Sequence, residues 1–108
     1  MINGKSVIAT TLARGGSSRI PKKNIAIVNG KPLLQYTTEE VKKSEYIDFY
    51  LVSSDDDEIL AVCNNIGVTT YRRPDHLATA SASSAAAVID AISHLNPYHY
   101  VVDVPCTN

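Results

Sequence analysis

Residues 6–24 read SVIATTLARGGSSRIPKKN, a short apolar run that passes directly into a basic segment rich in glycine and serine. The run Ser6–Leu12 is rich in β-branched residues, which predicts a β-strand. Two adjacent glycines follow, and glycine lets backbone N–H groups approach an anion without a Cβ in the way. Arginine offers phosphate oxygens a planar pair of donors, and lysine offers a point charge. The stretch therefore predicts a strand followed by a phosphate-binding loop, with an ordinary solvated basic loop as the alternative.

The spacing of the glycines excludes two common phosphate loops. Neither the Walker pattern G-x-x-x-x-G-K-S/T nor the dinucleotide pattern G-x-G-x-x-G occurs in the segment.

The rest of the chain alternates short apolar runs with segments of helical periodicity. Asn29-Gly30 predicts a turn, Pro32 suits the first position of a helix, and Gly67 suits a helix end. Further strands are predicted at 47–53, 68–71 and 100–104, and helices at 33–44, 56–65 and 82–95. A β-α-β-α-β-α-β order with short connections predicts a parallel sheet with right-handed crossovers. The fold class is therefore a three-layer, Rossmann-like α/β unit.

Composition limits the class of protein. A chain of 108 residues, 44% hydrophobic and with a net charge of −1, fits one small globular domain and not a disordered chain. It contains no apolar run of the roughly 18 residues that a membrane span needs, and no visible secretory signal. Its two cysteines fit a cytoplasmic protein, so we expect a cytoplasmic location and no membrane partner.

Charge is unevenly distributed along the chain. Residues 1–38 hold six basic residues and no acid, whereas residues 39–108 hold four basic residues and eleven acids. Polymeric nucleic acid usually goes with a basic domain of pI above about 9, and the pI here is about 6.2. A small anionic ligand is therefore the expected partner, and not a nucleic acid.

The end of the chain bears on its domain organisation. Residues 105–108 follow directly after a run predicted to be a central strand, and ligands of open parallel sheets sit at the carboxyl ends of strands. The terminus is thus expected to lie in the site. We expect residues 1–108 to be the N-terminal, nucleotide-binding half of a larger domain; a naturally short protein is the alternative.

Four segments together resemble the acylneuraminate cytidylyltransferase (CMP-sialic acid synthetase) family. LARGGSSRIPKKNIAIVNGKPLL at 12–34 resembles its N-terminal signature. In the family's order follow VSSDDDEI at 52–59, RRPDHLATASASS at 72–84 and VVDVPCTN at 101–108. The resemblance implies a fold like that of nucleotide-diphospho-sugar transferases, truncated here because family members are longer.

The resemblance also implies an activity. In this family a hydroxyl of an acidic sugar attacks the α-phosphate of CTP, which forms the CMP-sugar and releases pyrophosphate. Mg²⁺ neutralises phosphate charge, and its paired aspartate ligands belong to the missing half, so no metal ligand is assigned in this chain. The implied partners are CTP and an acidic sugar, and the implied full-length enzyme is a homodimer.

The resemblance implies a role for each residue of this chain that stands at a functional position of the family's motifs. Arg14 and Lys23 would bind the triphosphate and serve catalysis, and Asn24 would contact the nucleotide. Arg73 would help to read the cytosine, and Thr107 would contact the sugar. The backbone cradle would comprise Leu12, Ala13, Gly15, Gly16 and Ser17, and the base would be flanked by Ala82 and Ser84.

Two departures from the family pattern concern the sugar. Ala80 stands where the family usually has an aspartate, and residues 105–108 lack the glutamine of the family's Q-P-T-S. A sugar related to sialic acid is therefore expected rather than sialic acid itself.

Two other functions stay open at this point. One is a nucleotide-binding module without turnover. The other is a glycosyltransferase-like domain that binds a nucleotide-sugar, because residues 55–57 match a D-x-D metal motif, although they follow the second strand and not the fourth. We interpret the acids at 55–58 as the start of a helix, capped by Ser54 and Asp55, where acids stabilise the positive end.

Overall fold

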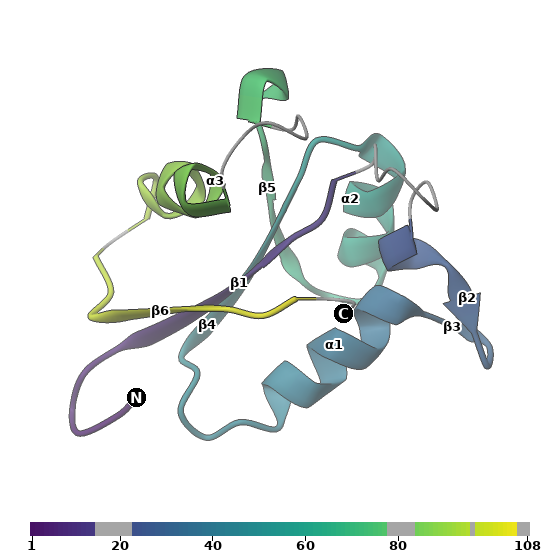
Figure 1. Ribbon diagram of the computed structural model, residues 1–108. Helices are drawn as coiled ribbons and strands as arrows, with labels where there is room; N and C mark the ends of the chain where they lie inside the picture. The colour runs from purple at the N-terminus through teal and green to yellow at the C-terminus, as the bar shows by residue number, and fades with distance from the viewer. Residues whose placement is uncertain (15–22, 78–83, 96, 106–108) are drawn as a thin grey trace.

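A four-stranded parallel sheet forms the centre of the computed structural model, which describes residues 1–14, 23–77, 84–95 and 97–105 (Figure 1). The strand order is β5-β4-β1-β6. The strands are β1 (Val7–Leu12), β4 (Phe49–Ser54), β5 (Thr69–Arg72) and β6 (Tyr100–Asp103). All neighbours pair in parallel, so the predicted parallel α/β sheet is confirmed.

Helices cover both faces of this sheet (Figure 1). Helices α1 (Leu33–Lys42) and α2 (Asp57–Asn65) lie on one face, and α3 (Ser84–Ile92) lies on the other. Two apolar clusters match these layers. One joins Val52 to Leu34 and Ile59, and the other joins Leu51 to Ala91. The three-layer architecture predicted from the sequence is therefore confirmed.

Strand β1 is the most deeply buried part of the chain. Its side chains from Val7 to Thr11 are almost fully covered because paired strands flank it and helices lie on both faces. A strand buried on both faces needs apolar or β-branched residues throughout rather than an alternating pattern. This requirement explains the continuous run that the sequence shows here.

Helix α2 begins one residue later than expected. Its N-cap is Asp56, whose carboxylate accepts a hydrogen bond of 3.0 Å from the Ile59 N–H. The prediction that Ser54 and Asp55 form the cap is therefore wrong in detail; the Ser54 hydroxyl instead accepts from the Asp56 N–H at 3.1 Å. Gly67 follows the helix with a φ of +80°, a conformation that glycine adopts without strain, as predicted.

A small hairpin precedes α1. Strands β2 (Ile27–Val28) and β3 (Lys31–Pro32) pair in an antiparallel manner around Asn29 and Gly30, which both have positive φ values. The predicted turn is therefore present, and positive φ at both central residues is typical of a type I′ hairpin. Pro32 is the N-cap of α1 and not its first helical residue, because its ψ of 144° is extended.

Strand β6 lies at one edge of the described sheet, not at its centre as predicted. It pairs with β1 alone among the described strands, and all four of its residues are exposed. Asp103 is therefore a solvent-exposed carboxylate beside apolar residues of α3. Within the described residues, no helix is long and apolar enough to cross a membrane.

Candidate functional site

Three strands bring the predicted nucleotide-binding residues to one edge of the sheet. The carboxyl ends of β1, β4 and β5 lie side by side, with β4 in the middle. Leu12 pairs in register with Ser53, and the Ala13 N–H donates to the Ser53 carbonyl at 2.9 Å. On the other side of β4, the Arg73 N–H donates to the Ser54 carbonyl at 2.7 Å. The described residues Leu12, Ala13, Arg14 and Arg73 therefore meet at this edge.

Arg73 is buried at this edge, with only 4% of its surface exposed. Its guanidinium donates from Nε to the Ser53 hydroxyl and from Nη2 to the Ser53 carbonyl, both at 3.2 Å. Nη1 donates to the carbonyl of Leu77 at 3.3 Å, which ties the short helix η2 (Asp75–Leu77) to the sheet. A guanidinium has five N–H donors, so one N–H on each terminal nitrogen is not used by these bonds.

The charge of Arg73 is poorly balanced in this position. Burial lowers the pKa of the Arg73 guanidinium, the Asp55 carboxylate raises it, and the cation of Arg14 lowers it again. The acceptors that bond to the guanidinium within the described chain are carbonyl and hydroxyl oxygens, which carry no full charge. Two arginines thus face one edge, and an anion bound there would relieve their repulsion.

Asn24 reaches the same part of the molecule from a different element. It lies in η1 (Lys23–Ile25), a short helix that packs against α1 and α2. Its neighbour Ile25 packs against the apolar cluster that contains Ala13. The segment after the basic loop is therefore anchored beside the end of β1.

The remaining predicted site residues lie outside the described part of the chain. This holds for Gly15, Gly16, Ser17, Ala82 and Thr107, and for the side chains of Lys23 and Ser84. The backbone of Lys23 begins η1, and that of Ser84 begins α3.

Ser53 and Leu77 hold Arg73 in place, and neither is among the site residues that the sequence predicts. Ser53 is only 1% exposed, and its hydroxyl and carbonyl both accept from the guanidinium. The available signal was its position, because Ser53 and Ser54 are the polar last residues of the otherwise apolar strand β4. A polar residue at the end of such a strand points to the ligand edge of a parallel sheet.

One of the acids at 55–58 caps helix α2, and two others lie in its first turn. Asp56 caps α2, and the Asp57 carboxylate pairs with the Arg72 guanidinium. No group of three or more histidine, cysteine or acidic side chains within the described ranges is arranged to hold a metal ion. The predicted helix start is therefore present at these acids, with Asp56 as its cap.

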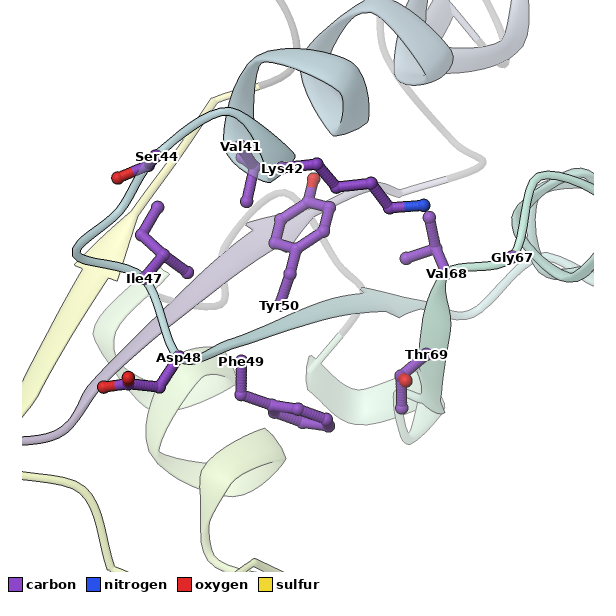
Figure 2. A pocket seen from close by; sticks show the side chains of 10 residues that line it. All are labelled: Val41, Lys42, Ser44, Ile47, Asp48, Phe49, Tyr50, Gly67, Val68 and Thr69. Carbon is purple, nitrogen blue, oxygen red and sulfur yellow. The ribbon is translucent and has the colours of Figure 1, made fainter. Parts of the chain in front are cut away.

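A hollow of about 320 Å³ lies at the opposite, amino edge of the sheet (Figure 2). Lys42, Phe49 and Tyr50 are among the residues that line it. Its carboxylate, Asp48, already accepts from the Val7 N–H at 2.7 Å and from the terminal ammonium at 3.1 Å. The hollow is therefore separate from the edge where the arginines meet, and its acid serves the fold.

Comparison with known proteins identifies the family of this chain. The family model described as cytidylyltransferase matches residues 8–108. A pseudaminic acid cytidylyltransferase of Campylobacter jejuni is 42% identical over 95 residues, which cover 87% of this chain and 41% of the relative. An N-acylneuraminate cytidylyltransferase of Oncorhynchus mykiss is 36% identical over 102 residues, or 94% of this chain and 23% of the relative. The chain therefore spans less than half the length of these curated relatives.

A solved structure gives the same fold. A CMP:2-keto-3-deoxy-manno-octonic acid synthetase, described as complexed with CTP, superposes with a TM-score of 0.83 at 18% identity. The match covers 94% of this chain and 40% of that one, so the likeness extends to nearly every element described above. Since the family model also matches almost the entire sequence, the protein belongs to the cytidylyltransferase family.

Proposed function

We propose that this chain is the nucleotide-binding half of an enzyme that transfers CMP from CTP to an acidic sugar and releases pyrophosphate. The observation that carries the proposal is the buried Arg73 at the carboxyl edge of the sheet, on the strand end that β4 separates from the end of β1, where Arg14 follows. Two arginines at this edge, one of them directly before a glycine-rich basic segment, suit a polyanionic nucleotide.

Each residue has a distinct part in the proposed chemistry. Arg14 and Lys23 bind the triphosphate and stabilise the negative charge that develops as pyrophosphate leaves. Gly15, Gly16 and Ser17 supply backbone donors in a cradle that Leu12 and Ala13 complete, and Asn24 contacts the nucleotide. Arg73 directs its two remaining N–H donors at cytosine, whose O2 and N3 are acceptors, while Ala82 and Ser84 flank the base.

Mg²⁺ is the proposed cofactor, and it would neutralise phosphate charge. On the family resemblance, we propose that its carboxylate ligands lie outside this chain. We also propose a cytoplasmic location, on the cysteine count, and a homodimeric full-length enzyme, on the family resemblance.

The acceptor is proposed to be a nonulosonate related to sialic acid, with Thr107 in its site. The sequence lacks the family's glutamine at 105–108, and one of the relatives is named for pseudaminic acid. This relative is 42% identical over the matched residues, which supports a sugar of this class in preference to sialic acid itself.

Nucleotide titration tests the proposal directly. The purified chain should bind CTP more tightly than UTP or ATP, by calorimetry in the presence of Mg²⁺. We expect no sugar-dependent release of pyrophosphate from the 108-residue chain, because it lacks the metal carboxylates and a complete sugar pocket. Equal affinity for the three nucleotides would contradict the proposed function, and turnover would contradict the proposed division of the enzyme.

A further inference from the structure

We propose that Ser53 is a positioning residue that couples the start of the phosphate-binding segment to Arg73, and so sets the discrimination between cytosine and uracil. This inference rests on the proposed function. Ser53 lies on β4, between the two strands that carry the predicted nucleotide contacts.

One residue joins both sides of the site. The Ser53 carbonyl accepts from the Ala13 N–H at 2.9 Å and from Arg73 Nη2 at 3.2 Å. Its hydroxyl accepts from Arg73 Nε at 3.2 Å. The backbone of the nucleotide segment and the buried guanidinium therefore both bond to Ser53, and they share its carbonyl oxygen.

The hydroxyl matters because a guanidinium needs fixed acceptors to hold its plane. Two donors, Nε and Nη2, bond to the hydroxyl and carbonyl of one residue, which defines the orientation of the whole fork. Removal of the hydroxyl leaves a buried Nε–H without its acceptor, and the fork then reorients toward other oxygens. The N–H groups that are directed at the base would move with it.

The carbonyl bond to Ala13 is made by the main chain, so a side-chain substitution leaves it in place. Ser53→Ala should therefore affect recognition of the base and spare recognition of the phosphates. A purely structural residue would instead weaken binding of CTP, UTP and pyrophosphate together.

A double-mutant cycle tests the coupling. CTP, UTP and pyrophosphate are titrated against the parent chain, Ser53→Ala, Arg73→Ala and the double variant. We expect Ser53→Ala to weaken CTP binding by about five- to fiftyfold, which reduces the difference in affinity between CTP and UTP. The affinity for pyrophosphate should stay within about twofold of the parent value. In the Arg73→Ala background the same substitution should have no further effect. If Arg73→Ala does not fold, Arg73→Lys replaces it, since lysine has no Nε–H fork.

Thr10→Ala serves as the matched control. Thr10 is as buried as Ser53 and lies on the neighbouring strand β1, and its hydroxyl has no partner within the described residues. This control should lose stability while CTP, UTP and pyrophosphate affinities stay within about twofold of the parent.

A ligand-free measurement separates the two proposals. In the parent chain the Arg73 Nε–H resonance should be protected from hydrogen exchange, and Ser53→Ala should abolish that protection. Failure of the parent to bind CTP would contradict the proposed function and leave this measurement to decide the coupling. Unchanged protection in Ser53→Ala, or additive effects in the cycle, would overturn the role of Ser53.

Discussion

At the scale of single residues, the two arginines of the site are predicted to divide their work. Arg14→Ala should weaken binding of both CTP and pyrophosphate by about ten- to a hundredfold, because each loses a charge-assisted hydrogen bond. Lys23→Ala should behave in the same way. Arg73→Ala should reduce the difference in affinity between CTP and UTP and leave the affinity for pyrophosphate nearly unchanged. Titration of the three ligands measures this, and a large loss of pyrophosphate affinity in Arg73→Ala would make Arg73 a phosphate ligand.

A second residue-scale prediction concerns the buried hydroxyls of β1. Thr10 Oγ1 is buried without a hydrogen-bond partner within the described chain, whereas Thr11 Oγ1 bonds to Tyr50 Oη at 2.6 Å and donates to the Val104 carbonyl at 2.7 Å. Thr10→Val removes an unsatisfied group and should raise the free energy of unfolding by about 1 kcal/mol. Thr11→Val, the matched substitution next to it, should lower that free energy by about 1–3 kcal/mol. Urea unfolding of both variants measures the difference, and shifts of the same sign would refute it.

At the scale of elements, Asp48 links the amino ends of β1 and β4 and should make the stability of the fold sensitive to acid. The Val7 N–H and then the terminal ammonium lower the pKa of the Asp48 carboxyl below its ordinary 3.8. The ionised Asp48 carboxylate therefore contributes fully to folding stability above the pKa that it has in the unfolded chain. This contribution is lost as the pH falls through its lower pKa in the folded protein. Urea midpoints of the parent and Asp48→Asn should differ at pH 7 and converge as the pH falls below the ordinary pKa of 3.8. A difference that stays constant through the acid range would contradict this assignment.

Helix α2 depends on its cap at the same scale. Asp56→Ala removes the carboxylate that accepts from the Ile59 N–H and should lower the free energy of unfolding by about 0.5–2 kcal/mol. Asp56→Asn keeps a capping oxygen and should retain most of the stability. Asp57→Ala is the control, because Asp57 lies inside the first turn and does not cap it. An equal loss from Asp56→Ala and Asp57→Ala in urea unfolding would show that charge, not capping, stabilises this end.

The longer helices and strands can be predicted from the sequence because each has a residue pattern that extends over many positions. The apolar run of β1 and the helical spacing of α1 extend over enough residues to show a period. The hairpin of β2 and β3 has two residues in each strand, so no period exists and only its turn is visible. The role of Ser53 is set by hydrogen bonds to residues 40 and 20 positions away along the chain, and no local pattern encodes such contacts.

At the scale of the whole molecule, the edge strand β6 exposes an apolar surface. Along β6 the three residues Tyr100, Val101 and Val102 are 44%, 40% and 42% exposed, and Ile89 of α3 is 64% exposed. Beside them a hollow of about 330 Å³ is lined mainly by apolar side chains of α3. The strand was predicted to be central, and its composition still suits that place. An apolar run is thus exposed on a strand that, within the described residues, pairs with a neighbour on one side only.

The final prediction follows from that exposed edge. The purified chain should associate with itself as its concentration rises, because an apolar edge strand is a template for pairing with another chain. Val102→Lys places a charge on the edge and should shift the onset of association to roughly tenfold higher concentration, since about 1.4 kcal/mol of lost interaction corresponds to that factor. Val28→Lys is the matched control, because Val28 is 41% exposed and lies in the separate β2–β3 hairpin. Sedimentation velocity over a concentration series measures both variants. A monomeric parent at every concentration, or equal shifts in the two variants, would show that β6 does not drive association.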